Sequence, residues 1–262
     1  MPSDLKKAFV FSMLPDSLSL EDRFRLAKDI GLDGVEVHPI GSEDEIRAMR
    51  AAADKAGIEI HSIMFGGWKA PLSSPDAGAA EQGAADLAAT VESAGKLGAD
   101  AVLLVPAVVN EGTRYVEAYE RSQKHLRKLA GVAEKHKTYI LIENVWNNFL
   151  LSPLEFARYI DEIASEYVQA YFDVGNVVAF GWPQDWIRTL RQRIKRVHLK
   201  DFKRGPRQWC NLREGDVNWP EVRKALDEVG YKGYLTAELP GGDEAYLRDV
   251  GDRIEKIIRG LA

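Results

Sequence analysis

The sequence predicts an α/β protein that folds as a single (β/α)8 TIM barrel over residues 1–262. Eight short apolar runs alternate with amphipathic stretches along the chain, which gives about 33 residues per repeat, the size of one βα unit. Such alternation indicates a parallel sheet covered by helices, and eight units favour a closed barrel. Because no linker, low-complexity tract or compositional break divides the chain, we expect one domain.

The predicted strands are short runs rich in β-branched and aromatic residues. The first run leads into FSMLPDSLSLED, which lacks the glycine-rich turn that an open Rossmann-like sheet would need at this point. The closed barrel is therefore preferred over that alternative. In chain order, the predicted strands cover residues 8–14, 34–39, 58–65, 101–107, 139–146, 168–176, 196–202 and 234–239.

Helical patterns with recognisable ends lie between these runs. In the first, Leu20, Phe24 and Ile30 recur at helical spacing, and the second begins at Ser42 with Glu45 three residues later, the spacing of a capping box. Several helices end in a glycine shortly before a strand, which predicts left-handed C-caps at Gly31, Gly57, Gly98 and Gly230. The predicted helices cover residues 19–31, 42–57, 77–98, 115–137, 153–166, 183–194, 219–230 and 243–260.

Composition and charge restrict the class of function. The chain is 45% hydrophobic and 29% charged, so a packed core is expected. With 35 basic and 40 acidic residues the net charge is −5, which argues against a nucleic-acid partner. The single cysteine, Cys210, permits neither an intramolecular disulfide nor a cysteine-based zinc site. Because there is no apolar leader and no 18-residue apolar window, we expect a cytoplasmic protein without a membrane partner.

Polar residues end four successive predicted strands. Glu143, Asp173, His198 and Glu238 each follow an apolar run, and each step along the chain is one βα unit. Any one of them could simply cap a helix or satisfy a buried hydrogen bond. Four on neighbouring strands should instead meet at the C-terminal mouth of the barrel, where three carboxylates would repel one another without a cation. The set predicts one divalent metal ion: Mn²⁺ in the first place, with Mg²⁺, Co²⁺ or Zn²⁺ as alternatives.

At these residues the chain resembles the xylose-isomerase-like TIM barrel superfamily of sugar isomerases and epimerases. The resemblance covers essentially all eight units and is strongest in the motifs LIENVWNN, YFDVGNVVAFG, VHLKDF, LREGDVNW and LTAEL. In the ketose 3-epimerases of that superfamily, a Glu, Asp, His, Glu set binds one divalent metal, which implies this role for Glu143, Asp173, His198 and Glu238. The resemblance also implies that Glu143 and Glu238 act as the acid/base pair. The DVGN and HLKD forms are more similar to the L-xylulose-5-phosphate 3-epimerase branch than to the tagatose and psicose branch.

Two positions depart from the pattern of the free-ketose enzymes. Where those enzymes carry a histidine and a glutamate, this chain has Asn176 and Phe149. An arginine that contacts substrate in that branch is matched by Arg204. The related multi-zinc nucleases need more histidines than the five present here, and His125 and His136 fall within a predicted helix. A three-metal nuclease is therefore not expected.

Further residues are candidates for contacts with a small-molecule sugar or sugar phosphate. The substrate-binding candidates are His61, Trp146, Asn176, Lys200, Arg204 and Arg213. Glu36, His38 and Trp68 also end strands or follow them, and Asn144 and Asn176 could orient the metal ligands. The loop after the seventh strand could hold a phosphate through Lys203, Arg204, Arg207 and Arg213, or could simply be solvated. Lys200 and Asp201 could pair with each other or face the substrate.

These residues support one main function and two alternatives. Removing the weakly acidic proton beside a ketone needs a metal that stabilises the enediolate and a carboxylate on each face of the substrate. The main hypothesis is therefore a metal-dependent sugar epimerase or isomerase, most simply 3-epimerisation of a ketose or ketose phosphate. A lyase or dehydratase acting on a 3-keto sugar or inosose is the second reading, and a non-catalytic sugar-binding barrel is the third. A homo-oligomer is compatible with the sequence.

Overall fold

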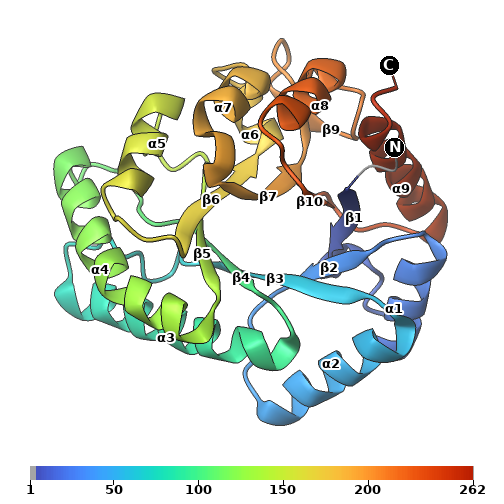
Figure 1. Ribbon diagram of the computed structural model, residues 1–262, viewed down its shortest axis with the longest axis horizontal. Coiled ribbons are helices and arrows are strands. Elements are labelled where there is room, and N and C mark those ends of the chain that lie inside the picture. The colour runs from blue at the N-terminus through green and yellow to red at the C-terminus, as the bar shows by residue number, and fades with distance from the viewer. Residues whose placement is uncertain (1–3, 262) are drawn as a thin grey trace.

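A closed barrel of eight parallel strands forms the centre of the structure, a computed structural model that describes residues 4–261 (Figure 1). Around the barrel the strand order is β1-β10-β7-β6-β5-β4-β3-β2, and every neighbouring pair is parallel. The predicted (β/α)8 barrel is therefore confirmed. The barrel strands are β1 (Leu5–Val10), β2 (Gly34–Val37), β3 (Glu59–Gly66), β4 (Ala101–Leu104), β5 (Tyr139–Glu143), β6 (Val168–Asp173), β7 (Ile194–Leu199) and β10 (Gly233–Ala237).

Helices surround the barrel and cover its outer face (Figure 1). They are α1 (Leu20–Asp29), α2 (Glu43–Ala56), α3 (Ala77–Leu97), α4 (Tyr115–His136), α5 (Pro153–Asp161), α6 (Val174–Val178), α7 (Pro183–Leu190), α8 (Trp219–Glu228) and α9 (Glu244–Ile258), with 3-10 turns η1 (Phe11–Met13) and η2 (Arg191–Arg193). The start of α2 is as predicted, because the Ser42 hydroxyl accepts the backbone N–H of Glu45. The four predicted glycine caps all have positive φ.

All of the predicted strands except the third extend too far at their C-terminal ends, where the site lies; β3 ends at Gly66, one residue beyond its predicted end. Residues predicted as strand after Val10 form η1, and those after Asp173 form the short helix α6. The reason is local, since the Asp173 carboxylate accepts the backbone N–H of Asn176 and so starts a helix directly from the strand. The loop after β7 also contains a two-stranded antiparallel hairpin, β8 (Asp201–Lys203) and β9 (Gln208–Cys210), which the sequence did not predict.

Apolar side chains fill both sides of the barrel wall. The larger core lies between the strands and the helices, and a smaller cluster fills the barrel interior with Ala101, Leu103, Leu141 and Tyr171. Of these, Leu141 and Tyr171 lie two positions before Glu143 and Asp173, on the same face of their strands. The polar residues at the mouth therefore rest on a packed apolar layer.

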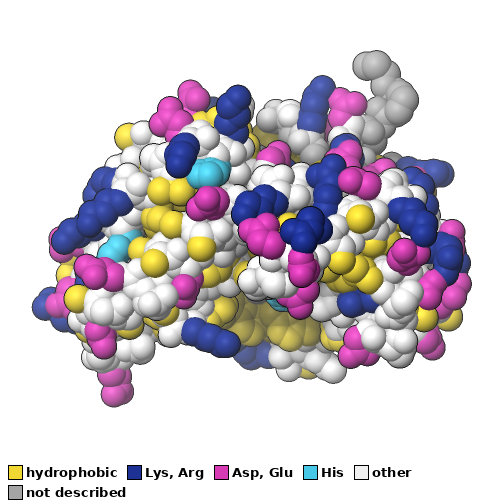
Figure 2. Space-filling model, turned by 90° about the horizontal axis from the view of Figure 1, so that it is seen from below, with side chains coloured by type: hydrophobic (Ala, Val, Ile, Leu, Met, Phe, Trp, Pro, Cys, Tyr) yellow, Lys and Arg dark blue, Asp and Glu magenta, His cyan; other side chains and the backbone are white. Residues whose placement is uncertain are grey.

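The outer surface carries charges of both signs. On the side shown in Figure 2, Lys and Arg side chains are interspersed with Asp and Glu. Among residues 4–261, no helix combines the length and apolar character that a bilayer span requires.

Candidate active site

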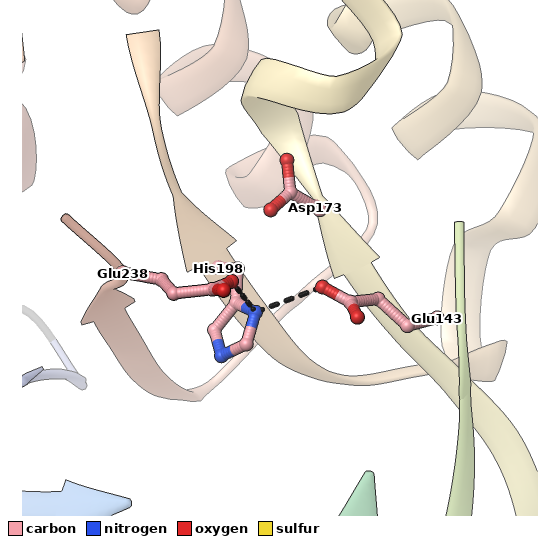
Figure 3. Close-up of side chains that lie close together, drawn as sticks. All are labelled: Glu143, Asp173, His198 and Glu238. Carbon is pink, nitrogen blue, oxygen red and sulfur yellow. Dashed lines mark hydrogen bonds and ion pairs between the residues drawn. The ribbon is translucent and has the colours of Figure 1, made fainter. Parts of the chain in front are cut away.

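Four polar side chains at the ends of successive barrel strands meet in the mouth. Glu143, Asp173 and His198 lie on β5, β6 and β7, and Glu238 directly follows β10. The strand register pairs Asp173 with His198 and His198 with Thr236, which lies two residues before Glu238 on the same face. One ligand atom from each of the four side chains lies within 4.8 Å of the others (Figure 3). The structure thus brings the whole predicted metal-ligand set together.

His198 lies between the two glutamates. Its Nδ1 atom is 3.0 Å from Glu143 Oε1 and 2.9 Å from Glu238 Oε2, and Figure 3 shows the two carboxylates pointing at the ring from opposite sides. Lys200 adds a cation, with its Nζ 3.2 Å from Asp173 Oδ2 and 2.6 Å from Glu238 Oε2. The two glutamates therefore flank a shared centre from opposing directions.

The second ring nitrogen of His198 is held by a carboxylate from β2. Glu36 is fully buried, and its Oε2 lies 2.6 Å from His198 Nε2. Ser62, which the strand register places opposite Glu36, donates its hydroxyl to Glu36 Oε1 at 2.7 Å. A carboxylate at this position would keep the proton on Nε2 when Nδ1, which faces Glu143 and Glu238, binds a metal ion. The sequence places Glu36 near the end of the second predicted strand, but it does not predict the bond between Glu36 and His198.

Replacing Glu36 with glutamine is expected to weaken Mn²⁺ binding by about 10–100-fold, the usual cost of losing the partner of a metal-bound histidine. The amide can still accept a hydrogen bond, but it no longer carries the charge that orients the ring. The signal of free Mn²⁺ in electron paramagnetic resonance measures the affinity without any turnover. Ser62→Ala is the control, because it removes the other bond of Glu36 and leaves the carboxylate on His198. Equal affinity of Glu36→Gln and wild type would contradict this role.

Burial and neighbouring charges set different pKa values at the two glutamates. Burial raises the pKa of Glu143 to about 7, against the opposing effect of His198. Burial also acts to raise that of Glu238, but the charges of His198 and Lys200 together lower its pKa to about 2. Although burial acts to lower the pKa of His198, the carboxylates around it raise that pKa well above its ordinary value. The cationic groups thus stabilise the ionised form of Glu238, whereas burial disfavours the ionised form of Glu143.

The donor set fits a divalent cation. Three carboxylates supply hard oxygen ligands and His198 supplies one nitrogen, a combination suited to Mn²⁺, Mg²⁺, Co²⁺ or Zn²⁺. Asp173 Oδ2 is buried and has no hydrogen-bond donor among the described residues, and its neighbour is the Lys200 ammonium. This oxygen could ligate a metal ion in exchange for its ion pair with Lys200.

Two asparagines fix the ends of β5 and β6 relative to each other. The Asn144 side chain donates to Asp173 O at 2.8 Å and accepts the Asp173 N–H at 2.9 Å, which extends the pairing of the two strands. Asn176 donates from its side chain to Asn144 O at 2.9 Å, and Trp146 Nε1 donates to Asn176 O at 2.9 Å. The network sets the spacing between the ligand strands, the orienting role expected for Asn144 and Asn176.

The glycine of the DVGN motif allows Lys200 to approach the metal ligands. A Cβ atom on Gly175 would lie 2.8 Å from the carbonyl carbon and oxygen of Lys200, too close for backbone atoms to tolerate. We therefore expect Gly175→Ala to cost about 1–3 kcal/mol in the free energy of unfolding, measured by denaturant titration, and to weaken Mn²⁺ binding. Gly131→Ala in α4 is the matched control, because a Cβ there meets nothing within 4 Å and should stabilise the helix. Equal stability of Gly175→Ala and wild type would show that this contact is unimportant.

Asp201 organises the loop after β7 instead of pairing with Lys200. Its carboxylate accepts the backbone N–H groups of Arg213 at 2.8 Å and Val217 at 3.2 Å, and Trp219 Nε1 at 2.9 Å. This carboxylate therefore fixes the returning part of the loop, and the β8–β9 hairpin extends from the same base. The hairpin carries Trp209, a mouth residue that the sequence analysis missed because no strand was expected there.

Two adjoining cavities of about 430 and 420 Å³ open at the mouth. The predicted substrate residues Trp146, Asn176 and Lys200 all line the first, together with the glutamates at its base. The second cavity shares its wall with the first, and the residues common to both are His38, Met64, Lys200, Trp209 and Glu238. Trp68 also lines the first cavity.

Three predicted substrate residues are not brought to these cavities. His61 is buried at the other end of the barrel, where it stacks on Tyr234 at 4.0 Å and lines a separate cavity of about 550 Å³. The Arg204 guanidinium lies 3.9 Å above the Trp182 ring, and Arg213 is absent from the lining of either mouth cavity. Phe149 stands where the free-ketose enzymes carry a glutamate, and it does not line these cavities either. It is buried in an aromatic cluster whose other members are Tyr115, Tyr119 and Tyr159.

Comparison with known proteins gives relatives of the same architecture. L-ribulose-5-phosphate 3-epimerase UlaE of Escherichia coli strain K12 is 26% identical over 249 residues, which cover 87% of each chain. A D-psicose 3-epimerase from Clostridium cellulolyticum H10, solved with D-tagatose, is 17% identical with a TM-score of 0.83 and covers 98% of this chain and 99% of its own. The 3-keto-D-glucoside 4-epimerase YcjR from E. coli is 16% identical with a TM-score of 0.81, covering 97% and 98%.

At these identities the solved structures show a shared fold alone. The family model is more specific, because the xylose isomerase-like TIM barrel family matches residues 24–259 of the chain. This match agrees with the motifs at the strand ends and with the closed barrel around them. The protein belongs to the xylose isomerase-like TIM barrel family.

Proposed function

We propose that the protein is a metal-dependent epimerase, an isomerase that inverts a carbon beside the carbonyl of a keto sugar. The observation that carries this proposal is the placement of Glu143 and Glu238 on opposite sides of one donor cluster (Figure 3). Inversion needs one carboxylate to take a proton from one face and another to return a proton to the opposite face. The relative UlaE, an L-ribulose-5-phosphate 3-epimerase, supports the same chemistry.

Glu143, Asp173, His198 and Glu238 would hold the metal ion, and we propose Mn²⁺ as that ion. A bound divalent ion would act as a Lewis acid that offsets the negative charge developing on the substrate as the proton leaves. Glu36 orients His198, and the asparagines at the ends of β5 and β6 hold the ligand spacing. One of the two glutamates takes the proton from a given epimer and the other returns one, with the roles exchanged for the reverse reaction.

We propose that the sugar binds in the mouth cavities against Trp146, Asn176 and Lys200. Among residues 4–261, Lys200 is the one lysine or arginine that lines either cavity, and its ammonium already contacts Asp173 and Glu238. Phosphate recognition normally uses arginine or lysine that is free to pair. These observations favour an unphosphorylated keto sugar over a ketose phosphate.

Incubation with a panel of keto sugars and L-ribulose 5-phosphate in deuterium oxide, with Mn²⁺, tests this function. The expected result is an epimeric product that carries solvent deuterium at the inverted carbon. Loss of a hydroxyl or glycosyl group from the neighbouring carbon would instead identify the lyase or dehydratase. No exchange and no product from any sugar, despite bound Mn²⁺, would favour a sugar-binding barrel and overturn the proposal.

We also propose that the chain acts as one cytoplasmic domain on small molecules, without a nucleic-acid or membrane partner. Its net charge of −5 supports this reading. Sedimentation velocity would determine whether it assembles as a homo-oligomer.

A further inference from the structure

Three tryptophans leave much of their surface exposed around one cavity. Trp68, Trp146 and Trp209 line the mouth cavity of about 430 Å³, and they are 52%, 45% and 42% exposed. They come from three separate loops, after β3, after β5 and in the hairpin after β7. Clustered exposed aromatic surface in a concave site is typical of a surface that binds a ligand.

Two of these tryptophans form a supported stack. The rings of Trp146 and Trp209 are 5.0 Å apart with an interplanar angle of 25°, and the edge of Phe202 contacts both. Trp209 is placed by its strand pairing with Phe202, and Trp146 by its bond to Asn176 O. Because packing and hydrogen bonds fix the stack, it can present indole surface at little conformational cost on binding.

The tryptophans lie beside the reacting centre and leave space next to it. Glu238 and Lys200 line both mouth cavities, whereas Trp68 and Trp146 line only the one that also contains Glu143. Each cavity alone falls within the roughly 300–1,000 Å³ typical of a site for a drug-sized ligand. A single five- or six-carbon sugar held at Glu143 and Glu238 would leave a large part of this volume, and much of the indole surface, in contact with water.

We propose that the substrate is a glycoside, a keto sugar that carries a second ring, and that this ring packs against Trp68 and the Trp146–Trp209 stack. This inference rests on the proposed function, because it places the keto sugar at the metal cluster. A pyranose ring offers a face of C–H groups and an aromatic aglycone offers a flat π surface, so both supply the weakly polar face that indole binds. A phosphate group supplies neither, and among the described residues the only lysine or arginine lining this cavity is Lys200, which is already paired with Glu238.

Binding of matched glycosides to the Mn²⁺-loaded protein tests this proposal without requiring turnover. Methyl, phenyl and glucosyl β-D-glucosides, with L-ribulose 5-phosphate beside them, are titrated by calorimetry. The phenyl or glucosyl compound is expected to bind about tenfold more tightly than the methyl compound, the gain of a ring on an aromatic platform. The difference in affinity between the phenyl and glucosyl compounds shows whether the site prefers an aromatic or a sugar ring. The same order is expected in the rate of deuterium exchange when the keto forms of these glycosides are used.

Single substitutions test which tryptophans cause the tighter binding of the ring-bearing compounds. Trp68→Ala and Trp209→Ala should each abolish the advantage of the ring-bearing compounds, so that each variant binds the methyl, phenyl and glucosyl compounds with equal affinity. Trp182→Ala is the matched control, since Trp182 is 55% exposed but lines neither mouth cavity. Equal affinity for the methyl and ring-bearing compounds, tighter binding of L-ribulose 5-phosphate, or an equal loss in Trp182→Ala would overturn the proposal. If exchange still occurs with ring-free keto sugars, the epimerase function survives that failure.

Discussion

Replacing Glu143 or Glu238 by glutamine is expected to reduce turnover by about 10²–10⁴-fold, the usual cost of losing a general acid or base. Glutamine keeps the size of the side chain and one oxygen ligand, so metal binding should weaken only in part. Steady-state kinetics on the active keto sugar, at Mn²⁺ concentrations that load each variant, measures the effect. Both variants should lose turnover because the two carboxylates serve opposite faces of the same carbon.

Deuterium exchange then distinguishes the two glutamates. With a given epimer, the variant that lacks the proton-abstracting carboxylate should lose exchange as well as product. The other variant can still exchange deuterium into the substrate without inverting it, because the first carboxylate is intact. If both glutamine variants, loaded with metal, convert substrate at the wild-type rate, the two-carboxylate mechanism is wrong. Lys200 would then be the next proton-transfer group to test, because its ammonium lies 2.6 Å from Glu238 Oε2 and could return a proton to the substrate.

Replacing His198 by alanine is expected to remove the metal and the activity together. The substitution deletes the single nitrogen ligand and also leaves the buried Glu36 carboxylate without its partner at 2.6 Å. Removing one member of a buried pair costs roughly 3–5 kcal/mol, so the variant should also unfold at lower denaturant concentration. Metal content by mass spectrometry, read beside the unfolding curve, separates loss of the ligand from loss of the fold.

His61→Ala is the matched control for this variant. His61 is also a buried histidine, but it lies at the other end of the barrel in contact with Tyr234 and Thr236. Its removal should lower stability while the protein still binds one metal ion. A His198→Ala protein that keeps both its metal and its activity would show that the ligand set has been wrongly assigned.

The fold and the ligand set could be predicted because they depend on local pattern and on chain order. Strand–helix alternation predicted the barrel. The parallel arrangement then required Glu143, Asp173, His198 and Glu238 to meet, because equivalent strand ends lie at one level of the mouth. The strand ends themselves were overextended, since a side-chain cap such as Asp173 can start a helix inside an apolar run.

What the sequence could not supply depends on contacts between distant segments. Glu36 and His198 are 162 residues apart, and only the closed barrel shows that one orients the other. His61 was expected to contact the substrate, but position within a predicted strand does not give the depth along the barrel axis, and His61 lines a separate cavity away from the mouth. Trp209 was missed because its place depends on a short hairpin that is built on Asp201 and has no strong strand signal.

The rate of deuterium exchange as a function of Mn²⁺ occupancy tests the central claim most directly, that one metal held by these four residues makes the proton beside a carbonyl removable. Protein stripped with a chelator is titrated with Mn²⁺, and bound metal and exchange into the keto sugar are measured in the same samples. We expect negligible exchange without metal and a rise that saturates at one Mn²⁺ per chain. Exchange at full rate in the chelated protein, or saturation unrelated to a single bound ion, would contradict it.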